Sequence, residues 1–127
     1  MNYRKFIISP VRNIDDETAK KIKEYVELLE KQNHKVHWPA RDTPQNDPTG
    51  GYQICKTNFE AIMKTRTIHI WYDETSHGSK FDMGGVFMLI EMLGWKKKII
   101  IANENEVIDD TKKSFFKVFK KIIEKGA

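Results

Sequence analysis

The sequence contains one cysteine, Cys55, and no long hydrophobic run. A single cysteine excludes an internal disulfide and a zinc site built from cysteine pairs. No stretch approaches the roughly 20 consecutive apolar residues that a membrane-spanning helix needs. The amino-terminal segment MNYRKFIISP lacks the longer apolar region and the small-residue cleavage site of a secretory signal. We therefore expect a cytoplasmic protein with no membrane partner.

Repeats and low-complexity segments are also missing from the 127 residues. This length fits a single domain, residues 1–127, with its own hydrophobic core. The net charge is +4, and much of the excess lies in WKKK and in the last segment, KKSFFKVFKKIIEK. The aromatic residues of the last segment fall on its apolar side and do not alternate with the cations. We therefore do not expect nucleic acid as a partner.

Short apolar runs alternate with helical patterns along the chain. The apolar runs predict strands at residues 4–9, 34–38, 67–71 and 97–102, and the helical patterns cover about 15–32, up to 65, 81–93 and 110–125. The segment 39–53 is rich in proline and glycine and predicts a loop, long enough for a lid. This order predicts an α/β fold: a single-domain parallel sheet of about four to five strands flanked by helices, flavodoxin-like or Rossmann-like.

Polar and small residues gather where the predicted strands end. In a parallel sheet covered by helices, ligands bind beyond the carboxyl ends of the strands. The residues that follow the first three strands are Ser9 and Arg12, then Trp38 and Arg41, then Asp73, Ser76 and Ser79. We expect these side chains to face a common ligand. The histidines show no recognised ligand spacing, so no metal site is predicted.

The segment SHGSKFDMGG, residues 76–85, predicts a strand-to-helix turn with its helix starting near Phe81. Free backbone N–H groups at a helix start attract anions, and Gly78 lets the backbone approach a ligand closely. The hydroxyl groups of Ser76 and Ser79 add donors, and Asp82 can point back into the cleft. We expect an anion-binding turn beside a carboxylate.

A purely structural interpretation of the same segment is also open. Ser79 would cap the helix, Asp82 would complete a capping box, and Gly78 would only form the turn. The glycine pair, Gly84 and Gly85, would let the helix pack closely on a strand.

The segment SHGSKFDMGGV resembles the signature of the nucleoside 2-deoxyribosyltransferase superfamily, and most closely that of the 2'-deoxynucleoside 5'-phosphate N-hydrolases. Ser76, Gly78, Asp82, Gly84 and Val86 fall on the signature positions, and the order of elements agrees from position 5 to about 103. The family uses a glutamate as nucleophile at C1' of the sugar. The resemblance implies this role for Asp82, in a reaction like that of a retaining glycosidase.

The resemblance also implies a nucleotide substrate and no cofactor. The hydrolases carry serine at the position of Ser76, where it contacts the 5'-phosphate, and an arginine at the position of Arg12. A second family acid, which assists at the base, corresponds to Asn58 here, and Asp73 is the substitute carboxylate that the sequence offers. Ser76, Ser79, Arg12 and the Gly78 turn would then hold the phosphate.

Aspartate for glutamate at position 82 and asparagine for aspartate at position 58 depart from the family pattern. They keep a second hypothesis open, a module that binds a nucleotide or nucleotide-derived signal without chemistry. We expect a homo-oligomer in either case, because MGGVFMLIEML is apolar on nearly all sides. The predicted partner is a small nucleotide or nucleoside.

Overall fold

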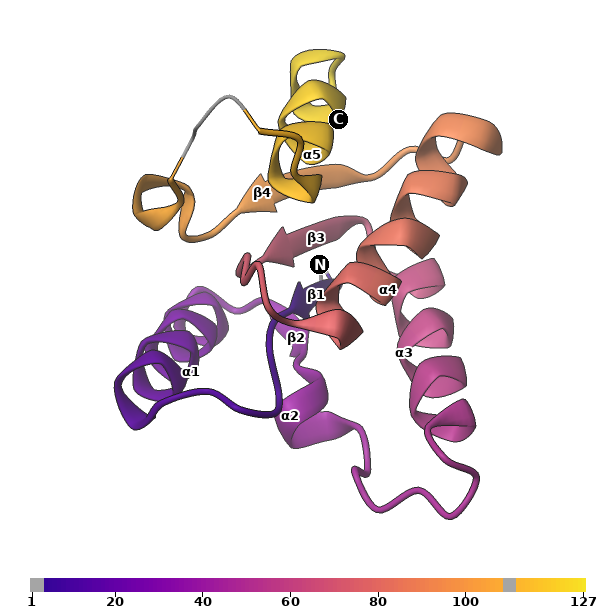
Figure 1. The fold of residues 1–127 in the computed structure, drawn as a ribbon. Helices are drawn as coiled ribbons and strands as arrows, with labels where there is room; N and C mark the ends of the chain where they lie inside the picture. The colour runs from indigo at the N-terminus through magenta and orange to yellow at the C-terminus, as the bar shows by residue number, and fades with distance from the viewer. Residues whose placement is uncertain (1–3, 109–111) are drawn as a thin grey trace.

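The computed structural model describes residues 4–108 and 112–127 and contains one four-stranded parallel sheet (Figure 1). The strands lie in the order β2-β1-β3-β4. Their bounds are Arg4–Ile8 for β1, Lys35–His37 for β2, Thr67–Ile70 for β3 and Lys98–Ile101 for β4. The predicted α/β fold with a parallel sheet is confirmed, and each strand lies within its predicted run.

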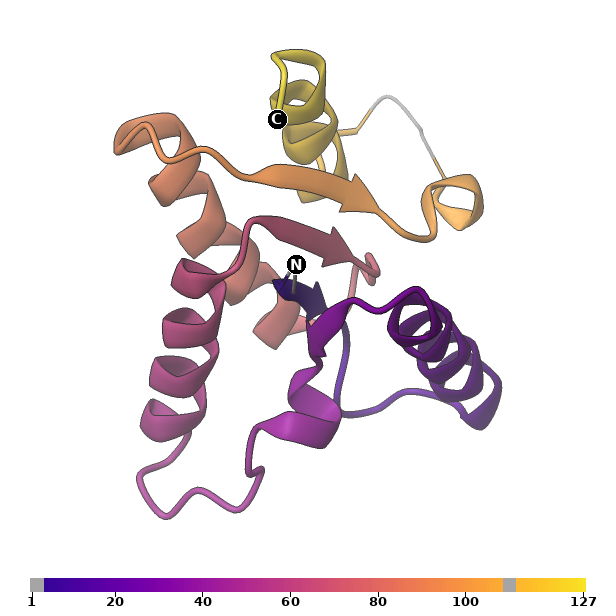
Figure 2. The ribbon, with the colours of Figure 1, turned by 180° about the vertical axis from the view of Figure 1, so that it is seen from behind.

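The two faces of the sheet are covered by different helices. Phe6 is in register with Ile68, and Ile68 with Ile99, so these buried side chains share one face. They pack in one cluster with residues of α3 (Tyr52–Lys64), α4 (His77–Phe87) and α5 (Phe115–Glu124). On the other face Ile7 packs against α1 (Asp16–Lys31), which lies beside the strands in the view from behind (Figure 2).

Helix α4 begins at His77, earlier than the predicted start near Phe81. Ser76 is its N-cap and accepts a hydrogen bond from Ser79 N at 3.2 Å. The prediction that Ser79 caps the helix is therefore wrong, because two serines at this spacing both suit a cap and the sequence alone cannot choose. The helix continues as a π-helical turn, η1 (Met88–Met92).

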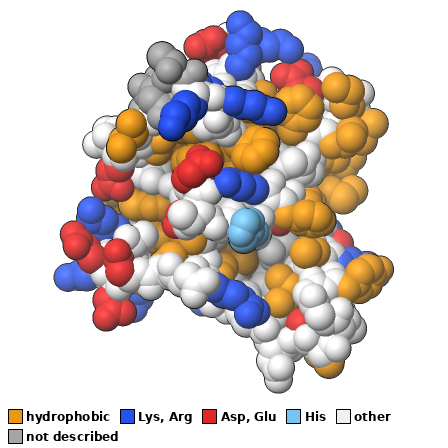
Figure 3. All heavy atoms as spheres, in the orientation of Figure 1, with side chains coloured by type: hydrophobic (Ala, Val, Ile, Leu, Met, Phe, Trp, Pro, Cys, Tyr) orange, Lys and Arg blue, Asp and Glu red, His pale blue; other side chains and the backbone are white. Residues whose placement is uncertain are grey.

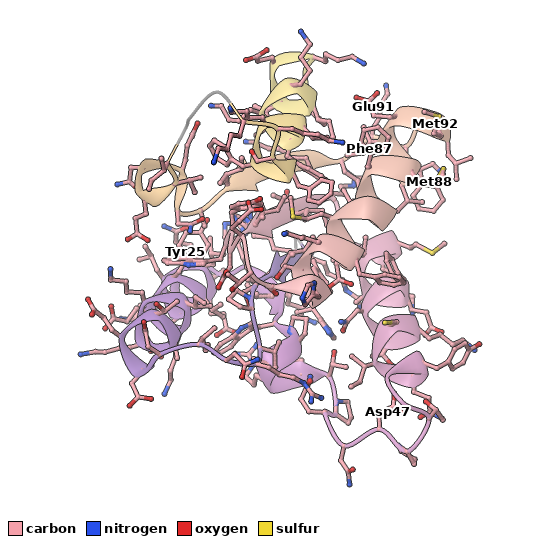
Figure 4. The ribbon with its side chains drawn as sticks, viewed as in Figure 1. Tyr25, Asp47, Phe87, Met88, Glu91 and Met92 are labelled. Atoms are coloured by element: carbon pink, nitrogen blue, oxygen red, sulfur yellow. The ribbon has the colours of Figure 1, made fainter. Side chains whose placement is uncertain are left out.

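The segment predicted as the loop 39–53 contains a short helix, α2 (Pro39–Asp42), so the prediction of an unbroken loop is wrong. Asp47 fixes the part that leads into α3 (Figure 4). Its carboxylate accepts hydrogen bonds from Thr49 N at 2.7 Å and Ile54 N at 3.0 Å, and the bonds with Thr49 are the main reason that its pKa falls to about 2. The loop is thus tied to the first turn of α3.

The last helix, α5, spans Phe115–Glu124, and Ser114 is its N-cap. The predicted start lies outside the described residues. Phe115 was expected to face the core but is 44% exposed, whereas Phe116 and Phe119 are buried as predicted. A short 3-10 helix, η2 (Glu104–Glu106), follows β4. In the described part of the chain, no helix has the length and apolar character needed to cross a bilayer.

Candidate active site

A cleft of about 500 Å³ opens where the strand order reverses. The chain leaves β1 toward β2 on one side, whereas β3 lies on the other side of β1, so the connections after β1 and β3 diverge at the carboxyl edge. Ligands of parallel α/β sheets bind at such a switch point. The volume is within the range of small-molecule sites, about 300–1,000 Å³.

The cleft brings together many of the residues that the sequence singled out. Those that line it are Ser9, Arg12, Asn58, Ser76, Gly78, Ser79 and Asp82. They come from the end of β1, from α3 and from the start of α4. The clustering follows from the parallel topology, because the carboxyl ends of β1 and β3 are neighbours.

Four other predicted residues lie outside this cleft. Asp73 lines a separate cleft beside β4 and accepts hydrogen bonds from Thr75 N at 2.8 Å and Thr75 Oγ1 at 2.7 Å. Trp38 packs against the cluster under α1, and Gly84 is exposed on α4. The fourth residue is Arg41.

Arg41 is held by acids near the start of the 39–53 segment. It donates a hydrogen bond to Glu30 Oε1 at 3.0 Å and two to the Asp42 carboxylate, at 2.8 and 2.9 Å.

The packing of the glycine pair, Gly84 and Gly85, also differs from the expectation. A Cβ on Gly85 would lie 1.9 Å from Phe59 Cε1, whereas one on Gly84 would meet nothing within 4 Å. Gly85 therefore permits close packing of α4 on α3, and not on a strand.

Asp82 is a buried carboxylate at the wall of the cleft. Its side chain belongs to the second turn of α4, and the neighbouring Met83 and Val86 fix that helix in the core. The residue is only 7% exposed, and burial raises its pKa to about 7. Within residues 4–108 and 112–127, no hydrogen bond or ion pair reaches its carboxylate. A strongly shifted carboxyl group in a cleft is typical of a functional site.

Asn58 lines the cleft and belongs to a chain of buried and half-buried hydrogen bonds. Thr43 Oγ1 donates to Asn58 Oδ1 at 2.8 Å, and Thr43 Oγ1 lies 2.9 Å from His37 Nε2. The threonine hydroxyl has one proton, which it gives to Asn58, so His37 Nε2 is the donor in the second bond. Because the amide oxygen is occupied, the Asn58 Nδ2 group is the one available to a ligand.

The start of α4 supplies the donors on another side of the cleft. Ser76 Oγ donates to Ser79 Oγ at 2.9 Å. The first intrahelical bond runs from Lys80 N to Ser76 O, so the N–H groups of His77 and Gly78 have no intrahelical partner. Such groups, with the helix dipole, attract anions.

Ser9 adds a buried hydroxyl to the cleft. Its Oγ is buried and has no hydrogen-bond partner in the described part of the protein. A buried polar atom without a partner is costly unless something satisfies it. A polar ligand atom in the cleft would satisfy Ser9.

The sequence did not identify Cys55, Gln45 and Thr43 as parts of this site. Cys55 and Gln45 line the cleft, and burial together with the charge of Asp82 raises the pKa of the Cys55 thiol. Cys55 lies one helical turn before Asn58, which could have indicated a shared face. Gln45 and Thr43 belong to the proline-rich segment, whose course carries no periodic signal. Across the described residues, no group of His, Cys, Asp and Glu is arranged to hold a metal ion.

No known family model and no curated protein matches the chain in sequence. A solved structure of a 2-deoxyribosyltransferase from the psychrotolerant bacterium Bacillus psychrosaccharolyticus superposes with a TM-score of 0.56 at 16% identity. The match covers 68% of this chain and 66% of that one, so the chain spans slightly less than two thirds of its length. At this identity the likeness concerns the fold. The chain has the α/β fold of that 2-deoxyribosyltransferase.

Proposed function

We propose that the protein cleaves or transfers the N-glycosidic bond of a nucleoside 5'-monophosphate or related nucleotide, with Asp82 as nucleophile. The observation that carries this proposal is the buried Asp82 carboxylate in a ligand-sized cleft at the switch point. The fold shared with a 2-deoxyribosyltransferase supports it.

The chemistry would proceed in two steps at C1' of the sugar. An Asp82 oxygen forms a bond to C1' while the bond from C1' to the base nitrogen breaks, and the base leaves with the electron pair and takes a proton from water. Water or a second base then attacks C1' and releases the Asp82 carboxylate, and the hydroxide from the first step takes the proton that this attacking group loses. Only the ionised carboxylate is a nucleophile, and the surrounding apolar side chains would strengthen its attraction to the positive charge that develops on the sugar.

The phosphate would lie at the start of α4. Ser76 and Ser79 offer hydroxyl groups, and His77 and Gly78 offer backbone N–H groups there. Arg12 lines the same cleft and supplies a cation. These groups suit a phosphate better than a neutral hydroxyl, since charge-assisted hydrogen bonds to phosphate are the stronger kind.

The base would lie toward Asn58. With its oxygen bonded to Thr43, this amide presents its NH₂ group and would pair with a carbonyl or ring-nitrogen acceptor of the base. An amide cannot transfer a proton to the leaving base, so its contribution is a hydrogen bond. Asp73 lies in another cleft and is the weaker candidate for this role.

A second candidate is a module that binds a nucleotide without chemistry. The raised pKa of Asp82 favours it, because a carboxyl group with a pKa of about 7 is largely protonated below neutral pH. Calorimetry with nucleosides and 5'-monophosphates, followed by chromatography after long incubation, separates the two functions. Binding with release of free base supports the enzyme, and saturable binding without any release supports the module.

We also propose that the protein forms a homo-oligomer through the outer face of α3, α4 and η1. This face exposes large apolar side chains, namely Tyr52, Met63, Phe81, Met88 and Met92, and Figure 3 shows apolar side chains gathered along this edge. Figure 4 places Met88 and Met92 on the outer side of the helix. Phe81 also lines the cleft, so a second copy would close one wall of it. Light scattering of wild type and Met88→Glu tests this: a larger assembly reduced to a monomer supports it, and a wild-type monomer contradicts it.

A further inference from the structure

Cations gather at the amino edge of the sheet, opposite the cleft. The register pairs Arg4 with Lys35, and it places Thr67 beside both Lys5 and Lys98. Parallel strands begin at one edge, so these residues lie along that edge, with Arg4 and Lys35 on the face of Phe6 and with Lys5 and Lys98 on the opposite face. Lys64 and Arg66 flank the start of β3. We call this set the cationic rim: Arg4, Lys5, Lys35, Lys64, Arg66 and Lys98.

No acid neutralises the rim within the described parts of the chain. Several cations elsewhere have acidic partners, for example Lys21 with Glu106 at 3.3 Å and Lys80 with Glu74 at 3.3 Å. Burial and the charge of Lys98 lower the pKa of Lys5, as expected where like charges gather. An unneutralised set of cations creates a positive potential that attracts anions.

The rim borders two hollows in the surface. One, of about 230 Å³, is lined by Arg4, Lys5, Lys35 and Lys64. The other, of about 650 Å³, is lined by Arg66, Lys96, Lys98 and Trp95, and also by Glu91, whose carboxylate pairs with Lys125 of the same hollow. Trp95 is 38% exposed, and Lys97 Nζ lies over its ring at 5.6 Å from the centroid, so a base would have to stack on the face away from Lys97. The edge therefore combines concave basic surfaces with one accessible aromatic ring.

We propose that the cationic rim and Trp95 bind single-stranded nucleic acid. Sites for single strands combine a basic groove for the phosphates with aromatic rings on which bases stack. Three strand spacings of about 4.8 Å give the rim a length of about 14 Å, enough for several consecutive phosphates. The concave lining suits a polymer chain better than a flat membrane, and an exposed tryptophan ring needs an unpaired base.

In the sequence, only the WKKK segment of this edge was noted, which contains Trp95, Lys96 and Lys98, and the other rim cations were not singled out. Nucleic acid was not expected there, because the lysines of the last helix stand opposite its aromatic residues. The rim instead arises from strand ends that are distant in sequence and adjacent in the sheet. It is independent of the chemistry at Asp82.

The test is fluorescence anisotropy with a labelled, mixed-sequence single-stranded DNA of about 15 nucleotides. This length is near the upper limit of the strand that a single small domain covers. The rim variant is Arg4→Glu, Arg66→Glu, Lys98→Glu. The control has the same change in charge on helices α1 and α5: Lys20→Glu, Lys23→Glu, Lys121→Glu. We expect the rim variant to bind about 10-fold more weakly or worse, and with a shallower salt dependence, since each phosphate contact contributes about −0.7 to the slope. The control should stay within about 2-fold of wild type.

Trp95→Ala should weaken binding about 5-fold or more through lost stacking, and Trp95→Phe should largely retain it. The neutral variant Arg4→Gln, Arg66→Gln, Lys98→Gln provides the same comparison if the charge-reversed protein does not fold. Three results would overturn the proposal. The first is that wild type does not bind the single strand at low salt. The second is that the rim variant and the control variant lose the same affinity. The third is that wild type binds the matching duplex as tightly as the single strand and that Trp95→Ala has no effect.

Discussion

Thr43 Oγ1 donates a hydrogen bond of 2.8 Å to Asn58 Oδ1, and so a residue from the proline-rich segment determines which end of the Asn58 amide faces the cleft. The two residues are both buried. His37, at the end of β2, lies on the far side of Thr43. The site therefore depends on a link between β2, the 39–53 segment and α3.

Thr43→Val tests this link. Valine keeps the shape of threonine but leaves Asn58 Oδ1 and the His37 ring without their partner, so we expect a loss of about 1–3 kcal/mol in the free energy of unfolding. Urea denaturation measures it. Thr57→Val in α3 is the control, since no hydrogen bond of its side chain occurs in the described structure, and it should change stability by no more than about 0.5 kcal/mol. Equal effects of the two substitutions would contradict the assigned role of Thr43.

The burial of Asp82 predicts how stability depends on pH. Its pKa of about 7 in the folded state lies above the ordinary value, near 3.9. Between these values the folded state binds the proton more tightly than the unfolded state, so stability is lost as pH rises from about 4 to 7. The total is of the order of a few kcal/mol, at about 1.4 kcal/mol per unit.

Asp82→Asn should remove this loss and be more stable than wild type at pH 8. Urea midpoints for both proteins across the pH range measure the difference. Half-buried His37 and buried His69, whose pKa values burial lowers, favour stability as pH rises, but they do so in both proteins and cancel in the comparison. If the urea midpoints of the two proteins changed with pH in the same way, Asp82 would have the same pKa in the folded and unfolded states, and the prediction would be wrong.

The sheet and the clustering of Ser9, Asn58 and Asp82 could be predicted from the order of strands and helices along the chain. That order does not change when the end of an element is misplaced by a few residues. Four apolar runs alternating with helices leave few topologies, and a parallel sheet gathers its strand ends at one edge. A shift of the α4 start from Phe81 to His77 does not move Asp82 out of the cleft.

The glycine pair offers a matched test of helix packing. Gly85→Ala would place a methyl group 1.9 Å from Phe59 Cε1, so the ring must move, and we expect a loss of about 1–3 kcal/mol. Gly84→Ala meets nothing within 4 Å and should stabilise the helix by about 0.5–1 kcal/mol. Thermal unfolding of both variants measures the contrast. If both substitutions stabilised the protein, the Phe59 ring would be able to move away from the new methyl group at little cost, and the prediction for Gly85 would be wrong.

Ser76→Asp tests which group binds at the start of α4. Aspartate caps a helix as well as serine does, so the fold should be retained. Its charge would repel a phosphate, and we expect calorimetry to give about 10-fold weaker binding of 5'-monophosphates, or about 1.4 kcal/mol, with nucleoside binding unchanged. The control is Ser114→Asp, which alters the N-cap of α5. Unchanged affinity for 5'-monophosphates would place the phosphate elsewhere.

Other features could not be predicted because they depend on contacts distant in sequence. Thr43 reaches Asn58 only because α2 and the Asp47 turn fold the proline-rich segment back onto α3. The cationic rim consists of residues that each look like an ordinary strand-flanking cation. Only the register between β1, β3 and β4 brings Lys5 and Lys98 close together.

The most direct test of the central claim is the release of free base from nucleosides and nucleoside 5'-monophosphates, deoxy and ribo, by wild type and Asp82→Asn. Chromatography at pH 8, where Asp82 is mostly ionised, measures the release. The account predicts release from 5'-monophosphates by wild type and at least a 100-fold loss in the variant, on the order of 3 kcal/mol in transition-state stabilisation. Equal release by both proteins, or none from any compound that wild type binds, would contradict the role of Asp82 as nucleophile.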